Sequence, residues 1–338
     1  MKQFTRFNRS LILGLGLLFL VACTMVQASL SDVVTDSFEV KPGGTLSIES
    51  ERGAIIVTAH DKNSVDVRVI RKARVSSQSK ADEVFRSFNI DMKQKGDNVV
   101  ITGTKKESGL GLFGGDSRLD IRYEVKVPAT YNADLETSGG TIDVGDLDGK
   151  VRARTAGGSL QFGNITGSIL GETSGGSIEA ESCGGDVDVQ TAGGSIRVSD
   201  VSGDVKARTA GGSIRVGEVA GAAKVQTSGG SIRIDGVRRA VDARTSGGSI
   251  HVQLSGQPES DCTLETSAGS VTVTLPENIN LHVKARTLGG KVHTDLPISV
   301  QGELSQSQIE GTLNNGGPTL NMETMGGNIA IHKGRETL

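Results

Sequence analysis

Aromatic residues are scarce in this 338-residue sequence. Tryptophan is absent, aromatic residues make up 3% of the chain, and none follows Phe162. An α/β enzyme of this length normally fills a thick core with such side chains. Together with 47 glycines, the composition predicts a thin core of small and β-branched residues.

The sequence also lacks an excess of charge of one sign. Its formal net charge is −3 at pH 7, which supplies no overall attraction to nucleic acid. We therefore expect no nucleic-acid partner.

The one long hydrophobic run lies near the start. Lys2, Arg6 and Arg9 precede an apolar run over residues 11–21, which is too short to span a bilayer comfortably. The pattern predicts a cleaved signal peptide over residues 1–28, and therefore an exported protein of the cell envelope.

Two processing sites compete at the end of this signal peptide. Residues 20–23, Leu-Val-Ala-Cys, fit the lipobox of bacterial lipoproteins, which would place a diacylglyceryl group on Cys23 and tether the chain to a membrane. Thr24 then fits the pattern for outer-membrane retention. Residues 26–28, Val-Gln-Ala, fit ordinary cleavage before Ser29, which would leave the protein periplasmic or secreted. We favour the outer-membrane lipoprotein.

A tetrapeptide repeat dominates the rest of the chain. Thr-(Ser/Ala)-Gly-Gly recurs every 18 residues, the spacing then widens to 21, and a last copy follows a longer insertion. A fixed period of this kind is the signature of a stacked-repeat fold. The copies begin at Thr137, Thr155, Thr173, Thr191, Thr209, Thr227, Thr245, Thr266, Thr287 and Thr324.

One repeat, TAGGSIRVSDVSGDVKAR from Thr191, shows how a coil is built. Ile196, Val198 and Val201, then Val205 and Ala207, form two short period-2 strands with no helical period. The same alternation turns the repeat threonine inward, and the Gly-Gly pair supplies a corner that needs positive φ or close backbone approach. The opposite corner carries glycine in most repeats, and Arg239 in one of them.

The predicted fold class is therefore all-β. Coils of about 18 residues, each with two strands, form a β-solenoid over residues 131–336, with each coil stacked on the one before it. The left-handed hexapeptide helix of acyltransferases is excluded. That fold requires an aliphatic residue every six positions, but Ser202 and Arg208 follow Ile196 at that spacing. Calcium-binding nonapeptide repeats fail because no Asp recurs after the Gly pairs.

The residue pattern over 29–130 predicts a strand-rich N-terminal segment with one short helix. Longer alternating runs include residues 65–69 and 119–127, and residues 79–82 fit a capping box that opens a helix with Val84, Phe85 and Phe88 on one face. Because residues 53–57 echo the later coils, the segment is interpreted as continuous with the solenoid. A separate small β domain is the alternative.

These motifs resemble a known family. The turn over residues 42–44, the Gly-x-Ile-x-Val strand, the run Tyr-Glu-Val-Lys-Val-Pro over 123–128 and the Thr-x-Gly-Gly repeats are similar to the bacterial toast-rack family of adhesin-like β-strand repeats. The likeness covers roughly residues 35–334. It implies an exported or membrane-tethered protein with a role in surface adhesion or envelope-stress signalling, and it brings no catalytic residues.

Candidate catalytic and metal-binding residues are few. Residues 109–114 match GxGxxG, but a strand rather than a helix follows them, so we expect a hairpin loop and no dinucleotide. The histidines show no metal-ligand spacing and are predicted to be exposed. We therefore expect no catalytic residues, no metal, no cofactor and no small-molecule substrate. The histidines are His60, His251, His282, His293 and His332.

The two cysteines of the repeat region are predicted to be free thiols. Cys183 stands where Val201 and Val219 stand in the next two repeats, which favours a small buried apolar role. Cys262 lies several coils further on, roughly 20 Å away at sheet spacing. A disulfide requires Cα atoms within about 7 Å.

One predicted outward column carries a run of positive charge. Arg197, Arg215, Arg233 and His251 follow Glu179 in successive coils, whereas the outward columns of the second strand mix signs. Like charges on adjacent rungs repel by roughly 1 kcal/mol in water, so the run indicates a carboxylate neighbour such as Asp200, or an anionic partner. A solvated charged face without a partner is the plainer interpretation.

The sequence therefore favours a non-enzymatic scaffold, exposed at the envelope and adhesin-like. Its partner would be a protein or an anionic envelope polymer. An envelope-stress sensor or regulator is the alternative. A carbohydrate-active β-helix enzyme fits less well, because such sites need aromatic platforms and paired carboxylates. An ice-binding solenoid would have to expose its threonines.

Overall fold

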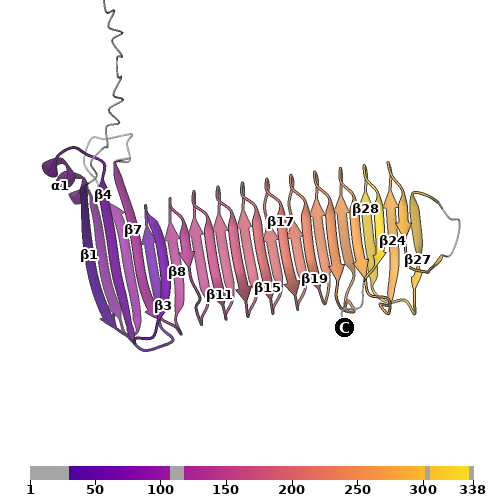
Figure 1. The fold of residues 1–338 in the computed structure, drawn as a ribbon, viewed down its shortest axis with the longest axis horizontal. Coiled ribbons are helices and arrows are strands. Elements are labelled where there is room, and N and C mark those ends of the chain that lie inside the picture. Colours follow the sequence, from indigo (N-terminus) through magenta and orange to yellow (C-terminus); the bar gives the residue numbers. More distant parts are fainter. Residues whose placement is uncertain (1–29, 107–117, 301–304, 335–338) are drawn as a thin grey trace, which may run out of the picture.

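The computed structural model describes residues 30–106, 118–300 and 305–334. These residues form a long rod of two β-sheets that face each other along the whole length of the rod (Figure 1). Sheet A has 14 strands and sheet B has 15. This architecture confirms the predicted all-β solenoid.

Each 18-residue coil adds one strand to each sheet. In the coil that begins at Thr191, β15 (Ile196–Val201) joins sheet A and β16 (Val205–Arg208) joins sheet B. Both pair in parallel with the strands of the next coil, so that Ile196 faces Ile214 and Val205 faces Ala223. The repeat period therefore sets the register of the stack.

The strands of the regular coils run from β8 to β23, and successive strands alternate between the two sheets. In sheet A they are β9 (Ile142–Val144), β11 (Leu160–Ile165), β13 (Ile178–Cys183), β15, β17 (Ile214–Val219), β19 (Ile232–Val237), β21 (Ile250–Leu254) and β23 (Val271–Leu275). In sheet B they are β8 (Asn132–Thr137), β10 (Val151–Thr155), β12 (Ile169–Thr173), β14 (Val187–Thr191), β16, β18 (Ala223–Gln226), β20 (Val241–Thr245) and β22 (Cys262–Thr266).

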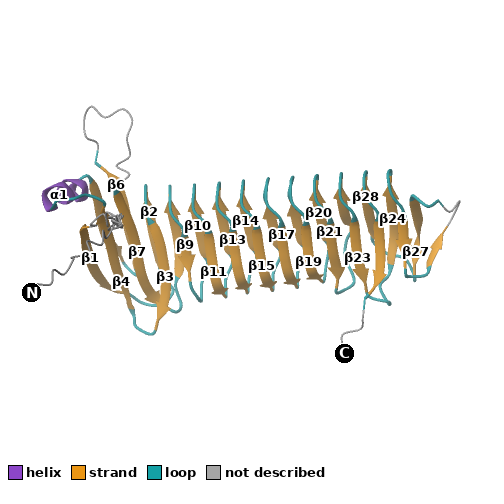
Figure 2. Ribbon diagram, turned by 45° about the horizontal axis from the view of Figure 1, so that its top comes forward, coloured by secondary structure: helices purple, strands orange, loops and turns teal. Residues whose placement is uncertain are grey.

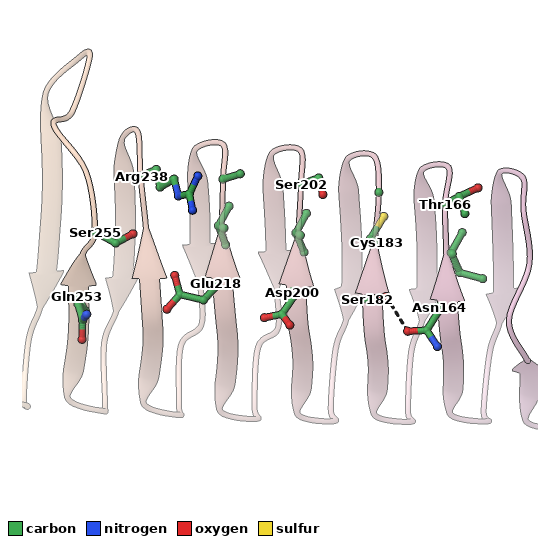
Figure 3. Close-up of a pocket in the computed structure, with 15 residues that line it drawn as sticks. Asn164, Thr166, Ser182, Cys183, Asp200, Ser202, Glu218, Arg238, Gln253 and Ser255 are labelled. Atoms are coloured by element: carbon green, nitrogen blue, oxygen red, sulfur yellow. Dashed lines mark hydrogen bonds between the residues drawn. The ribbon is translucent and has the colours of Figure 1, made fainter. Parts of the chain in front are cut away.

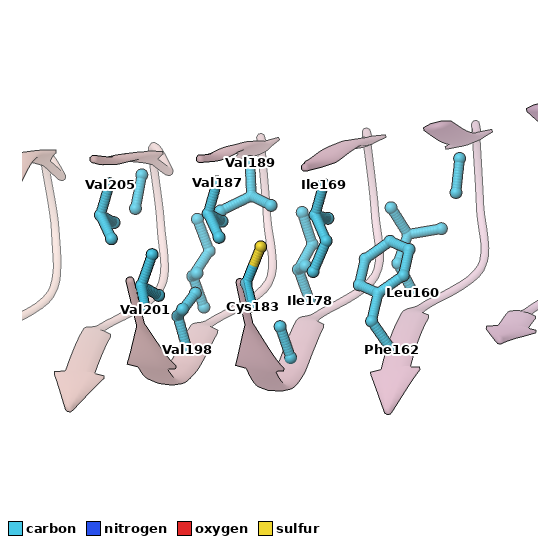
Figure 4. Close-up of a cluster of buried hydrophobic side chains, with 14 of the residues drawn as sticks. Leu160, Phe162, Ile169, Ile178, Cys183, Val187, Val189, Val198, Val201 and Val205 are labelled. Carbon is cyan, nitrogen blue, oxygen red and sulfur yellow. The ribbon is translucent and has the colours of Figure 1, made fainter. Parts of the chain in front are cut away.

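The core is one thin layer of small apolar side chains between the sheets (Figure 4). Val201 is 3% exposed and Val205 is 2% exposed, whereas Lys206 between inward neighbours is partly exposed. Valine, isoleucine, leucine and alanine fill most of the layer, with Phe162 the last aromatic in it. The predicted inward and outward alternation is confirmed.

The repeat threonines point inward, as predicted. All ten are buried, and each hydroxyl donates to the carbonyl of the second corner glycine, or of its equivalent, in the neighbouring coil, at 2.7–3.1 Å. Because the threonine ladder is inside the molecule, it cannot serve as an ice-binding face.

The Gly-Gly corners are required for close approach rather than for backbone conformation. A Cβ on the second glycine of any corner would lie 1.9–2.3 Å from a backbone oxygen of the adjacent coil. Among these described corner glycines only Gly140 has a positive φ. At the opposite corner, the Arg239 N–H donates to the Gly221 carbonyl at 3.3 Å, much as the Gly221 N–H donates to Gly203. That corner accepts a side chain.

The C-terminal coils do not stack in sequence order, so the expectation that each coil follows the one before it is wrong here. The coil of β28 (Thr319–Thr324) and β29 (Ile329–Lys333) is inserted between β22/β23 and the earlier coil of β24 (Leu281–Thr287) and β25 (Val292–Thr294). β26 (Ile298–Val300) and β27 (Gln308–Leu313) form antiparallel pairs at the end of sheet B.

The N-terminal segment is interleaved in the same way. The coil of β2 (Thr45–Ser50) and β3 (Ala54–His60) lies between β8/β9 and the later coil of β6 (Asn98–Lys105) and β7 (Leu119–Pro128). Three antiparallel strands close this end: β1 (Leu30–Glu39), β4 (Ser64–Ala73) and β5 (Phe88–Lys95). Both sheets and the core continue through this segment, and a domain boundary at residue 130 stays a prediction.

The predicted helix exists, but its predicted start is wrong. α1 (Gln78–Arg86) lies at the end of the rod that carries β1 (Figure 2) and buries Ala81, Val84 and Phe85. The N-cap is Ser77, with no side-chain cap, so Ser79 lies inside the helix. Asp82 accepts a hydrogen bond from Gln78 instead of capping, and Phe88 begins β5.

Several sequence predictions fall outside the described residues. These are the signal peptide over 1–28, Cys23 with its lipobox, the alternative mature start at Ser29, and the GxGxxG segment over 109–114. Within the described residues, no helix is long and apolar enough to cross a membrane.

Candidate functional site

The predicted basic column lies on the outer face of sheet A. Strand pairing places Arg197 beside Arg215, Arg215 beside Arg233, and Arg233 beside His251. Parallel pairing without an offset keeps these side chains on one face, about 4.8 Å apart along the rod. All four are exposed. We call these four residues the arginine column.

Carboxylates partly neutralise the arginine column. Asp235 lies 3.0 Å from the Arg215 guanidinium and 2.7 Å from that of Arg233, and Glu179 lies 3.7 Å from Arg197. The repulsion expected between stacked arginines is therefore relieved within the chain. Asp200, the neighbour named from the sequence, was the wrong carboxylate, because its side chain lines a groove near the end of the strand.

On the opposite face of the rod, basic side chains are paired with acidic side chains on neighbouring strands. On sheet B, Arg154 pairs with Glu172 at 3.0 Å and Arg244 pairs with Glu265 at 2.8 Å, each partner lying on the next strand. Lys206 pairs with Asp188 at 2.8 Å. Alternating signs leave no sustained run of one charge there, as the sequence predicted for the second-strand columns.

A groove of about 890 Å³, lined by polar and apolar side chains, runs along sheet A near the corner that follows β11 to β19 (Figure 3). The Ser182 hydroxyl donates to the Asn164 side-chain oxygen at 2.7 Å, and Asn164 in turn donates to Asp146 at 2.9 Å. Asp200 and Glu218 follow along the same wall. Within the described residues no group of three or more His, Cys, Asp or Glu side chains is placed to hold a metal ion, and the groove offers both polar and apolar contacts.

Two histidines that the sequence kept apart meet at the far end of the rod. Asp295 accepts from His293 at 3.0 Å and from His332 at 2.8 Å, and these contacts hold the pKa of the Asp295 carboxyl below its usual range. The insertion of β29 beside β25 brings them together. His60 contradicts the prediction of exposed histidines, because its side chain is 13% exposed and contacts the Ser64 carbonyl at 2.7 Å.

The cysteines of the described chain are free, as predicted, and both are buried, which was predicted for Cys183 alone. Cys183 occupies the slot that Val201 holds in the next coil. Burial raises the pKa of the Cys183 and Cys262 thiols, which disfavours the nucleophilic thiolate. Neither thiol has the environment of a catalytic cysteine.

Comparisons with known proteins agree with this architecture. The model of the Toastrack DUF4097 family matches residues 44–332. No curated protein matches the chain.

Three solved structures illustrate the likeness at low similarity. A candidate cell adhesion protein from Clostridium sporogenes is 13% identical, with 90% of this chain and 100% of that chain covered and a TM-score of 0.21. A candidate adhesin from Bacteroides fragilis is 12% identical, with coverages of 89% and 97% and a TM-score of 0.30. A candidate lipid binding protein from Parabacteroides distasonis is 12% identical, with coverages of 90% and 97% and a TM-score of 0.39.

These structural similarities are too low to add to the family assignment. The family match itself begins beside β2, in the N-terminal coil, and ends in β29, the last strand that the structure describes. It therefore spans the interleaved coils at both ends of the rod and every Thr-x-Gly-Gly corner between them. On that match, the chain belongs to the Toastrack DUF4097 family.

Proposed function

We propose that this protein is a non-enzymatic, adhesin-like scaffold of the cell envelope, anchored near its N-terminus and binding a macromolecular partner along its rod. The long uninterrupted sheets support a rigid spacer, because every interior strand is hydrogen-bonded on both sides. Solenoids of stacked repeats commonly use such extended surfaces for binding.

The observation that carries the proposal is the arginine column. It is the longest run of one charge on the sheet faces described above, and it lies on strands held in fixed register. Arginine recognises carboxylate and phosphate groups with two parallel hydrogen bonds. The expected partner is therefore an acidic protein or an anionic envelope polymer that competes with Asp235 and Glu179 for the guanidinium groups.

Photo-crosslinking in the native cell tests this proposal. A photoreactive amino acid would replace Ser199, which lies on β15 between the arginine column and the groove, and in a matched control it would replace Gln190 on the outer face of β14. We expect a specific product from the position at Ser199 and none from Gln190. Host or neighbouring-cell ligands in that product favour adhesion. Envelope signalling proteins favour stress sensing.

Anchoring through Cys23 has its own test. Because Cys23 precedes β1 by a short segment and ends a lipobox-like run, Cys23→Ala should move the protein from the membrane fraction to the soluble fraction. Intact mass spectrometry of the wild type should show the diacylglyceryl modification. A mature chain that begins with unmodified Ser29 contradicts the anchor and leaves the scaffold proposal standing.

A further inference from the structure

The corner residue that follows each repeat threonine changes character at the far end of the rod. In eight coils this residue is serine or alanine, beginning with Ser138 and Ala156, whereas in the last two coils in space it is Met325 and Leu288. These two coils are neighbours, because β28 pairs with β24 and the Leu288 N–H donates to the Thr324 carbonyl at 3.2 Å. The two side chains therefore lie on adjacent rungs.

Both side chains project into solvent. Leu288 is 65% exposed and Met325 is 53% exposed. Of the large apolar side chains in the described parts of the chain, the only other one so exposed is Val33, at 44%, on β1 at the opposite end of the rod. Single exposed apolar residues are ordinary, whereas exposed apolar side chains on adjacent rungs form a contiguous patch, which indicates a contact surface.

Positive charge appears at the same corner. The position after the two glycines is serine in seven successive coils, from Ser159 to Ser270, but it is Asn328 and then Lys291 in the last two. Arg286 lies just before the corner, beside Glu323 of β28. Arg286 and Lys291 are exposed, and neither has an ion-pair partner among the described residues.

We propose that this corner, formed by Leu288, Met325, Lys291 and Arg286, inserts into an anionic lipid surface. We call it the distal corner. Two apolar side chains at one corner cannot by themselves bury the roughly 800 Å² per partner that a stable protein interface needs. A lipid interface accepts a few apolar side chains when basic residues beside them meet the anionic headgroups.

The position of the distal corner suggests what the lipid contact would do in the cell envelope. It lies at the end of the rod opposite β1, and therefore opposite the proposed N-terminal anchor. A chain anchored in one membrane would reach a second lipid surface with this corner. That purpose rests on the proposed scaffold role, whereas the lipid contact itself is tested on the purified protein.

Vesicle capture tests the inference. The mature chain would be attached to beads through its N-terminal residue and exposed to vesicles of phosphatidylcholine alone or of an equal mixture with phosphatidylglycerol. We expect capture of the anionic vesicles only. The double variant Leu288→Ser with Met325→Ser should reduce capture about tenfold, because the apolar contribution is lost. Serine stands at this position in other coils, so the variant should fold.

Val33→Ser is the matched control, because it removes an exposed apolar side chain at the other end of the rod. Its capture should equal that of the wild type. Undiminished capture by the double variant, or equal capture of neutral and anionic vesicles, overturns the proposal. The remaining possibility is that the corner binds a second copy of the chain, which sedimentation tests. If the wild type self-associates and the double variant does not, the lipid proposal is also overturned. These outcomes leave the crosslinking test of the scaffold role unaffected.

Discussion

The Thr209 hydroxyl donates to the Gly194 carbonyl at 2.8 Å and accepts a hydrogen bond from the Gly212 N–H at 3.3 Å. Gly194 belongs to the preceding coil, so one buried hydroxyl joins two coils and also closes its own corner. Threonine suits the position because its methyl group packs in the core while its hydroxyl satisfies two backbone groups of the partly buried corner.

Replacing Thr209 separates these two contributions. Thr209→Val keeps the shape but leaves the Gly194 carbonyl and the Gly212 N–H without that partner, so we expect a loss of about 1–3 kcal/mol in the free energy of unfolding. Thr209→Ser keeps the hydroxyl and should cost about 1 kcal/mol through the lost methyl group. Urea unfolding measures both. A valine variant as stable as the wild type would contradict the role of the hydroxyl.

The two glycines of one corner should respond differently to alanine. A Cβ on Gly158 would lie 1.9 Å from the Gly140 carbonyl oxygen, whereas a Cβ on Gly157 would have no atom within 4 Å. Gly158→Ala must displace backbone and should cost about 1–3 kcal/mol or more. Gly157→Ala should stay within about 0.5 kcal/mol of the wild type. Thermal unfolding of the two variants compares them directly, and equal effects would rule out close approach as the cause.

The sequence predicted the coil because each position repeats the same physical requirement. Alternating apolar residues, the inward threonine and the corner glycine all recur at one period, so the register followed without ambiguity. The order of the last coils could not be predicted for the same reason. Thr287 and Thr324 present chemically equivalent corners, and either could donate to Gly269; the structure gives that contact to Thr324, while Thr287 donates to Gly327.

For the candidate site, the sequence predicted which residues stack along the rod but not which carboxylates they contact. A single column of residues spaced by 18 shows Arg215 above Arg197, but it does not show which carboxylate a long side chain can reach. Asp235 lies two residues along the strand from Arg233 and one rung from Arg215. Such diagonal contacts depend on side-chain conformation. His293 and His332 meet at Asp295 only because the coil of β28 and β29 is inserted out of sequence order, and the repeat period does not reveal that insertion.

Alkaline pH should weaken the N-terminal end of the rod. Burial raises the pKa of Tyr123 to about 12, although its hydroxyl lies 2.8 Å from that of Ser50, across the core between the sheets. The unfolded chain loses this proton near pH 10 and the folded chain near 12, so the free energy of unfolding should fall as pH rises between these values. Tyr123→Phe should flatten that fall in pH-dependent urea unfolding. An unchanged slope would place the titration elsewhere.

The arginine column provides the sharpest test of partner binding. With the three arginines Arg197, Arg215 and Arg233 changed to Gln, Asp235 and Glu179 remain and the face becomes acidic. Weak, salt-sensitive binding to polyphosphate or polyglutamate should therefore be lost, as judged by sedimentation at low and high salt. Stability should change by no more than about 1 kcal/mol for each exposed pair removed.

Two comparisons separate recognition by the arginine column from general charge. Changing Arg154, Arg208 and Arg244 to Gln removes the same charge from sheet B, where the arginines already alternate with acidic or amide neighbours, and should leave binding intact. Asp235→Asn should strengthen binding, because it frees the guanidinium groups of Arg215 and Arg233 that Asp235 now occupies. If the two triple variants bind alike, or if Asp235→Asn has no effect, the column is a solvated charged face and the partner of the rod binds elsewhere.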